Sequence, residues 1–246
     1  MSLSANTLFH FTKDLNTLTS ILRSRIFPRA CLESQLLPNL FKFRFAVPMA
    51  SFCDIPLSQI REHTEKYGNY AIGLKKEWAI QQGVTPVLYV HSQSVILQSI
   101  MSEIERLRNT PNLSQSSLSD RLYTLLRPVM MMKPYEEFDD RLQKIVRYYD
   151  EREWRYVPPQ RYPEEPDFLL EDFAKSPEIL QIFNTAKEKY GVVFNPDVIN
   201  YIIVKREDEV LPLKREIVQI KGKFSFDSVE LLTTRILSME RILQDM

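Results

Sequence analysis

Charged side chains alternate along a ten-residue segment, YYDEREWRYV at residues 148–157, whose composition predicts a β-strand. Aromatic and β-branched residues are enriched in it, and two consecutive prolines end it. Because successive side chains on a strand point to opposite faces, Glu151, Glu153 and Arg155 are expected to share one face. On a helix, Glu151 and Glu153 would lie about 200° apart around the axis and would not meet. The segment therefore predicts a β-sheet in which one strand holds two carboxylates and a guanidinium together.

Two carboxylates on one strand face suit chemistry in which a sugar carbon becomes positively charged. Residues two apart on a strand are roughly 7 Å apart, so Glu151 and Glu153 can face one cleft with Arg155 beside them. One carboxylate would hold a sugar hydroxyl and stabilise an oxocarbenium ion, while the other takes a proton from the acceptor or places it. A solvated strand face with an Arg–Glu pair has the same pattern. The segment alone leaves both interpretations open.

The overall composition predicts a folded globular protein with no general affinity for nucleic acid. The 246 residues include 32 Lys plus Arg and 32 Asp plus Glu, so the formal net charge is zero. The two cysteines, Cys31 and Cys53, have no CxxC spacing, which indicates a reducing compartment and no structural metal. The sequence has no signal-peptide pattern, no long apolar run and no glycine-rich phosphate loop. We therefore expect a cytoplasmic protein with no membrane partner.

The order of apolar patterns predicts a single α+β domain covering residues 1–246. Further strands are expected at residues 8–12, 46–55, 71–74, 87–90 and 198–204. Helices are expected at residues 15–22, 57–66, 75–82, 207–217 and 229–246, with a broken helical pattern at 171–190. Residues 92–147 are expected to form a mainly helical insertion, in which the three methionines at 130–132 fill gaps in the core.

Polar and aromatic side chains near the ends of these strands are further candidates for a site. Alternation along residues 8–12 places His10 and Thr12 on one face. Tyr67 and Tyr70 flank a Gly-Asn turn, where exposed rings can stack on a planar group, and Asp54 lies at the exit of a strand. Each has an ordinary structural alternative, namely a hydrogen-bonding histidine, tyrosines packed on the sheet edge and an aspartate that caps a helix.

Taken as a set, these residues resemble the scattered His, Tyr and Glu site of ADP-ribosyltransferase-like folds. The set consists of His10 on a first strand, the Tyr-Gly-Asn-Tyr corner at 67–70 and Glu-Arg-Glu-Trp-Arg at 151–155. More narrowly, the chain resembles the AbiGi-type abortive-infection family of bacterial phage-resistance proteins, through the same segments and residues 48–57 and 197–204. The resemblance implies an ADP-ribosyltransferase-like split, mixed β-sheet core with a helical insertion and C-terminal helices.

The resemblance also implies that NAD binds as a substrate. His10 would hydrogen-bond a ribose of NAD. The backbone near Phe11 and Thr12 would meet the nicotinamide amide, and Tyr67 or Tyr70 would stack on the nicotinamide ring.

The resemblance also implies roles for the three charged residues Glu151, Glu153 and Arg155. Glu153 would hold the nicotinamide-ribose hydroxyl and stabilise the oxocarbenium ion, which is an electrostatic form of catalysis. Glu151 would orient or activate the acceptor. Arg155 would pair with the diphosphate or with its own strand neighbours.

Three functions remain open at this point. The leading hypothesis is an NAD-dependent ADP-ribosyltransferase of anti-phage defence, which modifies a protein or nucleic-acid acceptor. The alternative is a catalytically inactive antitoxin or interaction module of a toxin–antitoxin pair, with a cognate toxin or antitoxin as partner. The third is a metal-dependent nuclease with His10, Asp54, Glu151 and Glu153 as magnesium or manganese ligands, although the sequence has no spaced acidic motif to support a metal site.

Overall fold

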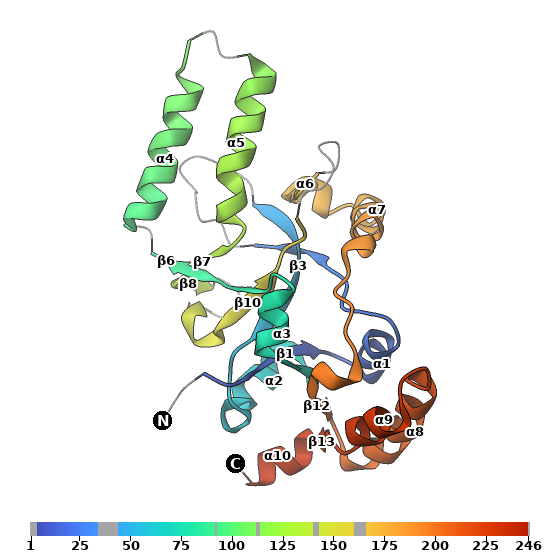
Figure 1. Ribbon diagram of the computed structural model, residues 1–246. Coiled ribbons are helices and arrows are strands. Elements are labelled where there is room, and N and C mark those ends of the chain that lie inside the picture. The colour runs from blue at the N-terminus through green and yellow to red at the C-terminus, as the bar shows by residue number, and fades with distance from the viewer. Residues whose placement is uncertain are drawn as a thin grey trace.

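A computed structural model describes residues 4–33, 44–91, 93–111, 114–139, 143–159 and 166–245 as a mixed α+β fold (Figure 1). The strands are β1 Thr7–Thr12, β2 Arg29–Leu32, β3 Phe45–Cys53, β4 Tyr70–Lys75, β5 Thr85–Pro86, β6 Leu88–Val90, β7 Met132–Pro134, β8 Glu136–Asp139, β9 Lys144–Arg147, β10 Glu153–Tyr156, β11 Leu169–Leu170, β12 Ile199–Val204 and β13 Ile236–Ser238. The helices are α1 Leu15–Arg23, α2 Arg61–Tyr67, α3 Lys76–Gln81, α4 Val95–Arg108, α5 Gln115–Val129, α6 Glu171–Ala174, α7 Pro177–Lys187, α8 Val210–Ile220, α9 Phe226–Thr233 and α10 Met239–Asp245.

The main sheet has the strand order β13-β12-β4-β1-β3-β10-β5, and β2 and β11 also pair with β3. Its pairs are antiparallel except β12 with β13, so the sheet is mixed. The strand predictions at residues 8–12, 46–55, 71–74 and 198–204 are confirmed by β1, β3, β4 and β12. These segments are apolar on both faces because helices cover both sides of the sheet.

The two faces of the sheet hold separate core clusters. One face packs Leu8, Phe52 and Ile72 against helices α1, α8 and α9. The other face packs Phe9 and Ala71 against the helical segments near α2 and α10. The alternation of β1 between the two clusters, with Leu8 on one side and Phe9 on the other, follows from the period of two along a strand.

The predicted strand at residues 148–157 is wrong for its first half. Residues Tyr148–Glu151 form a 3-10 helix, Arg152 adopts a left-handed conformation with φ of 45°, and only Glu153–Tyr156 is a strand. Tertiary contacts override the strand propensity here, because the Tyr149 ring packs against two other tyrosines at centroid distances of 5.4 and 5.5 Å. Glu151 therefore precedes a tight turn instead of lying two positions along a straight strand.

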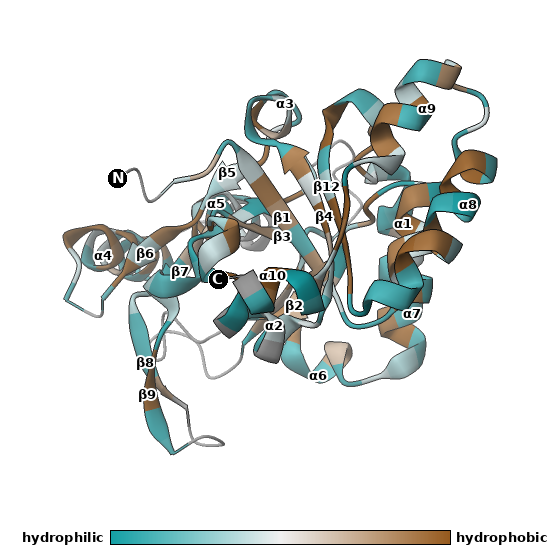
Figure 2. Cartoon of the chain, turned by 90° about the horizontal axis from the view of Figure 1, so that it is seen from below, coloured by the Kyte–Doolittle hydropathy of each residue, from teal (hydrophilic) through white to brown (hydrophobic). Residues whose placement is uncertain are grey.

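Two other segments differ from their expected structure. The helix expected at residues 229–246 is interrupted by β13, which extends the sheet by pairing in parallel with β12. The insertion at 92–147 is helical only in its first part, where α4 and α5 form a hairpin that extends away from the sheet (Figure 1). Its second part forms β7 and the β8–β9 ribbon, which projects from the body of the molecule (Figure 2). Met130 and Met132 are buried, as expected of core fillers.

Gly68 ends α2 and fixes the corner between Tyr67 and β4. Its φ is +111°, and a Cβ atom there would overlap the carbonyl oxygen of Thr12. We expect Gly68→Ala to lower the free energy of unfolding by more than about 1 kcal/mol, measured by urea unfolding. Gly83→Ala is the matched control, since Gly83 has φ of +86° but an added Cβ would meet no atom within 4 Å. An equal loss in both variants would contradict a steric role for Gly68.

Candidate functional site

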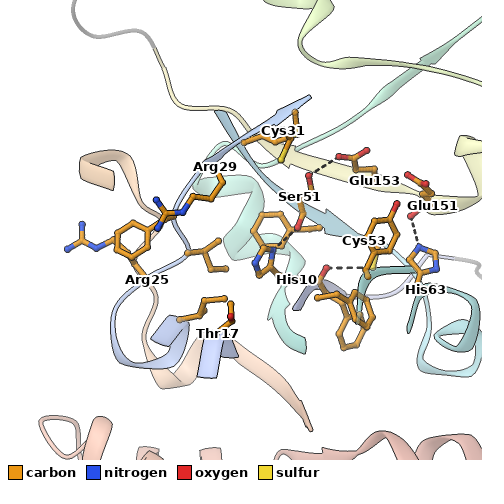
Figure 3. A pocket seen from close by; sticks show the side chains of 18 of the residues that line it. His10, Thr17, Arg25, Arg29, Cys31, Ser51, Cys53, His63, Glu151 and Glu153 are labelled. Atoms are coloured by element: carbon orange, nitrogen blue, oxygen red, sulfur yellow. Dashed lines mark hydrogen bonds between the residues drawn. The ribbon is translucent and has the colours of Figure 1, made fainter. Parts of the chain in front are cut away.

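A cavity of about 750 Å³ opens beside the junction of β1, β3 and β10 (Figure 3). Phe9 and Cys53 form the only register pair between the described residues of β1 and β3. Beyond this pair the side chain of His10 bridges the strands, with Nδ1 2.8 Å from the carbonyl oxygen of Ser51. The described pairing between β1 and β3 is therefore short, and the cavity is lined from both strands and from α1.

Both predicted glutamates lie on the cavity wall and share one cation. Lys133 Nζ donates to Glu151 Oε2 at 2.6 Å and to Glu153 Oε2 at 2.9 Å. The Lys133 side chain is 12% exposed and comes from β7, which follows the helical hairpin. Burial opposes the charge of Lys133, but the two glutamates raise its pKa above the ordinary value. The carboxylates thus meet as the sequence predicts, although a turn and a distant lysine bring them together.

Glu153 accepts hydrogen bonds at every position of its carboxylate. Oε1 accepts from Ser51 Oγ at 2.9 Å and Arg155 Nε at 2.8 Å, and Oε2 accepts from Lys133 Nζ and from Arg155 Nη2 at 3.1 Å. Burial raises the pKa of Glu153, but Arg155 and Lys133 outweigh it and lower the pKa to about 2. Glu153 is therefore ionised and its four acceptor sites are filled.

Glu151 is less completely bound. Its Oε1 accepts from Lys66 Nζ, and its Oε2 accepts from Lys133. Burial raises the pKa of Glu151, but these two lysines lower it below the ordinary value. The backbone carbonyl of Glu151 lies 3.2 Å from His63 Nε2, which ties the turn to α2. The Tyr67 side chain also forms a hydrogen bond with the Glu151 carboxylate.

Arg155 lies behind the cavity wall with 0% of its side chain exposed. It pairs with Glu153 and Glu33 and donates from Nη1 to the carbonyl oxygen of Met130 at 2.9 Å. The pairing with Glu153 is a contact with a strand neighbour, which is one of the two expected for Arg155. Arg155 positions Glu153 and is enclosed by protein.

Two of the three predicted residues on β1, His10 and Phe11, line the cavity, and Thr12 does not. His10 lines the cavity, and burial lowers its pKa below the ordinary value, against the opposing effect of the Ser51 carbonyl. Phe11 also lines the cavity and lies 6.2 Å from the ring of His63. Thr12 is buried outside the cavity, where its hydroxyl donates to the carbonyl oxygen of Asp14.

The two predicted tyrosines point in opposite directions. Tyr67 lines the cavity with its ring centroid 5.8 Å from that of His63, and burial and Glu151 raise its pKa. Tyr70 packs into the core cluster on the α1 side of the sheet, and its hydroxyl donates to Glu209 Oε1 at 3.0 Å. Of the two rings, the Tyr67 ring borders the cavity and the Tyr70 ring does not.

Asp54 lies apart from the glutamates. Its carboxylate accepts from Ser4 Oγ and the Ala5 amide and pairs with Lys76 at 2.7 Å. Among the residues that the structure describes, no group of three or more His, Cys, Asp or Glu side chains is arranged to hold a metal ion. The quartet of His10, Asp54 and the two glutamates is therefore not assembled.

Several residues of the cavity carry no signal in the sequence. Ser51 and Lys133 contact the predicted glutamates, and Glu33 pairs with Arg155. Two arginines, Arg25 and Arg29, line the cavity on the side of α1 and β2. A lysine directly before a proline at 133–134 and a serine inside an apolar strand give no local indication of a site. The pairing of β3 with β10 brings Ser51 to Glu153, and Lys133 reaches it from β7, which pairs with β6 in a separate sheet.

Comparison with known proteins places the chain in a family. The family model described as abortive phage resistance protein AbiGi, antitoxin, matches residues 24–205. An abortive phage resistance protein AbiGi of Lactococcus lactis subsp. cremoris is 29% identical over 223 residues, covering 81% of this chain and 88% of the relative. No solved structure matches the chain significantly. In the described residues, no helix has the length and apolar character needed to cross a membrane. Since the family model spans most of the sequence, the chain belongs to the AbiGi family of abortive phage resistance proteins.

Proposed function

We propose that this protein binds NAD in the cavity beside β1, β3 and β10 and transfers ADP-ribose to a protein or nucleic-acid acceptor during abortive infection. An ADP-ribosyltransferase-like fold and a cytoplasmic location are part of the proposal. The observation that carries it is the buried pair of ionised glutamates, Glu151 and Glu153, on the wall of a cavity of about 750 Å³. Aromatic side chains and a histidine line the same cavity.

The proposed reaction breaks the bond between nicotinamide and its ribose. The bonding electrons leave with nicotinamide, and positive charge develops on the ribose carbon. Glu153 binds the ribose hydroxyl and stabilises this charge, while Glu151 accepts the proton of the attacking acceptor as the new bond forms. Phe11 and Tyr67 bracket the departing ring. All four acceptor positions of Glu153 are filled, so the ribose hydroxyl can bind Glu153 only by displacing Lys133 from it.

Nicotinamide release and label transfer test this reaction directly. Wild-type and Glu153→Gln proteins are incubated with NAD labelled on the adenylate, in host lysate with and without phage infection. Transfer by the wild type is expected to fall by about 100-fold or more in Glu153→Gln, the scale of losing an electrostatic contact to the transition state. Circular dichroism of both proteins controls for unfolding. A folded wild type that consumes no NAD under either condition would sink the proposal.

A second candidate function is that of an antitoxin without catalytic activity. Two observations favour it: the matching family model carries the word antitoxin in its description, and protein groups fill every acceptor site of Glu153. In this case the chain neutralises a cognate toxin by binding it. Expression of the chain alone is then harmless, and co-expression rescues cells that carry the neighbouring toxin gene.

The helical hairpin is the part of the insertion to remove in that rescue experiment. The α4–α5 hairpin extends away from the sheet, so it offers the most separable surface for a toxin (Figure 1). Deletion of residues 92–127 is expected to abolish rescue while the sheet stays folded. Full rescue by the deleted protein would exclude the hairpin as the toxin-binding element.

A further inference from the structure

The two ends of the cavity differ in their charge balance. At one end, Glu33, Glu151 and Glu153 are matched by Lys66, Lys133 and Arg155 in one ion-pair network. Arg25 and Arg29 line the opposite end, on the far side of His10 from the glutamates (Figure 3). The glutamate end is therefore internally neutralised, whereas the arginine end has cations to offer to a ligand.

Arg25 has no partner for its charge within the part of the chain that the structure describes. Its guanidinium makes no ion pair or hydrogen bond there, although the residue is half-buried and lines the cavity. The aliphatic stem of Arg25 passes close over Gly191, where an added Cβ would overlap Arg25 Cδ. Because Gly191 has no side chain, it leaves room for this stem.

Arg29 forms an ion pair with Glu188 that is exposed to solvent. Its Nη1 lies 2.9 Å from Glu188 Oε1, but the two side chains are 48% and 41% exposed. An ion pair this exposed contributes little and exchanges readily for a stronger anion. The guanidinium also lies 5.3 Å from the centroid of the Phe27 ring, which limits its orientations. Arg29 can therefore turn to a ligand without leaving a buried charge.

We propose that Arg25 and Arg29 form a phosphate-binding subsite for the diphosphate of a nucleotide substrate. Guanidinium groups match phosphate oxygens with paired hydrogen bonds, and two of them at one end of a cavity suit a doubly charged diphosphate. Asn16 and Ser20, both on α1, line the same cavity and add neutral donors. Arg155, for which the diphosphate was one of two expected partners, is enclosed by Glu33 and Glu153 and is not available for it.

This assignment rests on the proposed function for the identity of the substrate, because it orients NAD along the cavity. The diphosphate lies at Arg25 and Arg29, and the nicotinamide ribose lies at Glu151 and Glu153. His10, between the two ends, faces the middle of the ligand (Figure 3). The chemistry of the subsite itself requires only a nucleoside diphosphate.

Calorimetric titration with ADP and with adenosine tests the subsite. Arg25→Gln and Arg29→Gln are each expected to weaken ADP binding about tenfold or more, while adenosine binding stays unchanged. Arg25→Lys, which keeps the charge but loses the fork, is expected to lie between them and the wild type. High salt is expected to weaken ADP binding in the wild type more than in either Gln variant. The matched control is Arg23→Gln, since Arg23 is 67% exposed and pairs with Glu216 outside the cavity.

Several outcomes would overturn the subsite. They are a wild type that binds no ADP, one that binds adenosine as tightly as ADP, and Gln variants that bind ADP like the wild type. The readout is separate from NAD turnover. If ADP binding depends on both arginines and survives in Glu153→Gln, but no variant or wild type consumes NAD, the subsite stands and the transferase proposal fails. If NAD is consumed and the arginine variants bind ADP normally, the transferase stands and the subsite fails.

Discussion

Replacing Arg155 with methionine is expected to destabilise the protein by about 3–5 kcal/mol, the scale of breaking a buried ion pair by removing one partner. The Arg155 side chain is 0% exposed and neutralises Glu153 and Glu33 together. Methionine fills part of the volume but leaves the buried Glu153 and the partly buried Glu33 without this cation. It also leaves the Met130 carbonyl oxygen without its donor. Urea unfolding monitored by circular dichroism measures the loss.

Arg23→Met is the matched control for Arg155→Met. Arg23 is 67% exposed and pairs with Glu216, so its loss is expected to change stability by less than about 1 kcal/mol. The double variant Arg155→Met with Glu153→Gln is expected to lose less stability than the sum of the two single variants. The neutral amide at position 153 no longer needs a cation beside it. Additive losses would mean that Arg155 and Glu153 do not stabilise each other in the folded protein.

Lys133→Met is expected to lower stability by about 3 kcal/mol at neutral pH, and by less in acid. Lys133 compensates Glu151 and Glu153 only while these carboxylates are ionised. A carboxyl whose folded pKa lies near 2 contributes stability that is present above its unfolded pKa of about 4.3 and is lost as the pH falls toward 2. Without Lys133 the pKa of Glu153 in the folded protein rises. The variant therefore lacks part of the stability that ionised Glu153 gives the wild type at neutral pH. The difference between wild type and variant therefore shrinks as the pH falls from 7 toward 3.

Chemical unfolding of both proteins at several pH values measures this difference. Lys175→Met is the control, since Lys175 is 64% exposed and pairs with carboxylates on the surface of α6. A difference between Lys133→Met and wild type that does not change with pH would show that Lys133 acts mainly through its contact with the Tyr148 ring, 4.8 Å from its Nζ.

The local patterns in the sequence predicted the strands better than the site. The apolar runs of β4 and β12 identify themselves because burial on both faces selects the same residue types along the whole strand. Glu151 and Glu153 could be paired from their spacing, but the turn at Arg152 could not, because tyrosine contacts from distant residues stabilise it. The partners of both glutamates come from segments up to 102 residues away along the chain.

The assignment of charges around the cavity also needed the structure. Arg155 alternates correctly with Glu153 on β10, yet the alternation does not tell whether the face is open or enclosed. Here β2 and β7 bring Glu33 and Lys133 over that face. Tyr70 illustrates the same limit, since one residue of strand register decides whether its ring faces the cavity or Glu209.

Lys133 sits on β7, only a few residues after the end of the α4–α5 hairpin. A macromolecule that tilted the hairpin would therefore move Lys133 away from Glu151 and Glu153. The free energy of leaving these two carboxylates without Lys133 would then weaken the binding of that macromolecule. Binding linkage is reciprocal, so a small ligand that displaces Lys133 from Glu153 would change the affinity of the macromolecule for the hairpin. The macromolecule would change the affinity of the small ligand by the same factor.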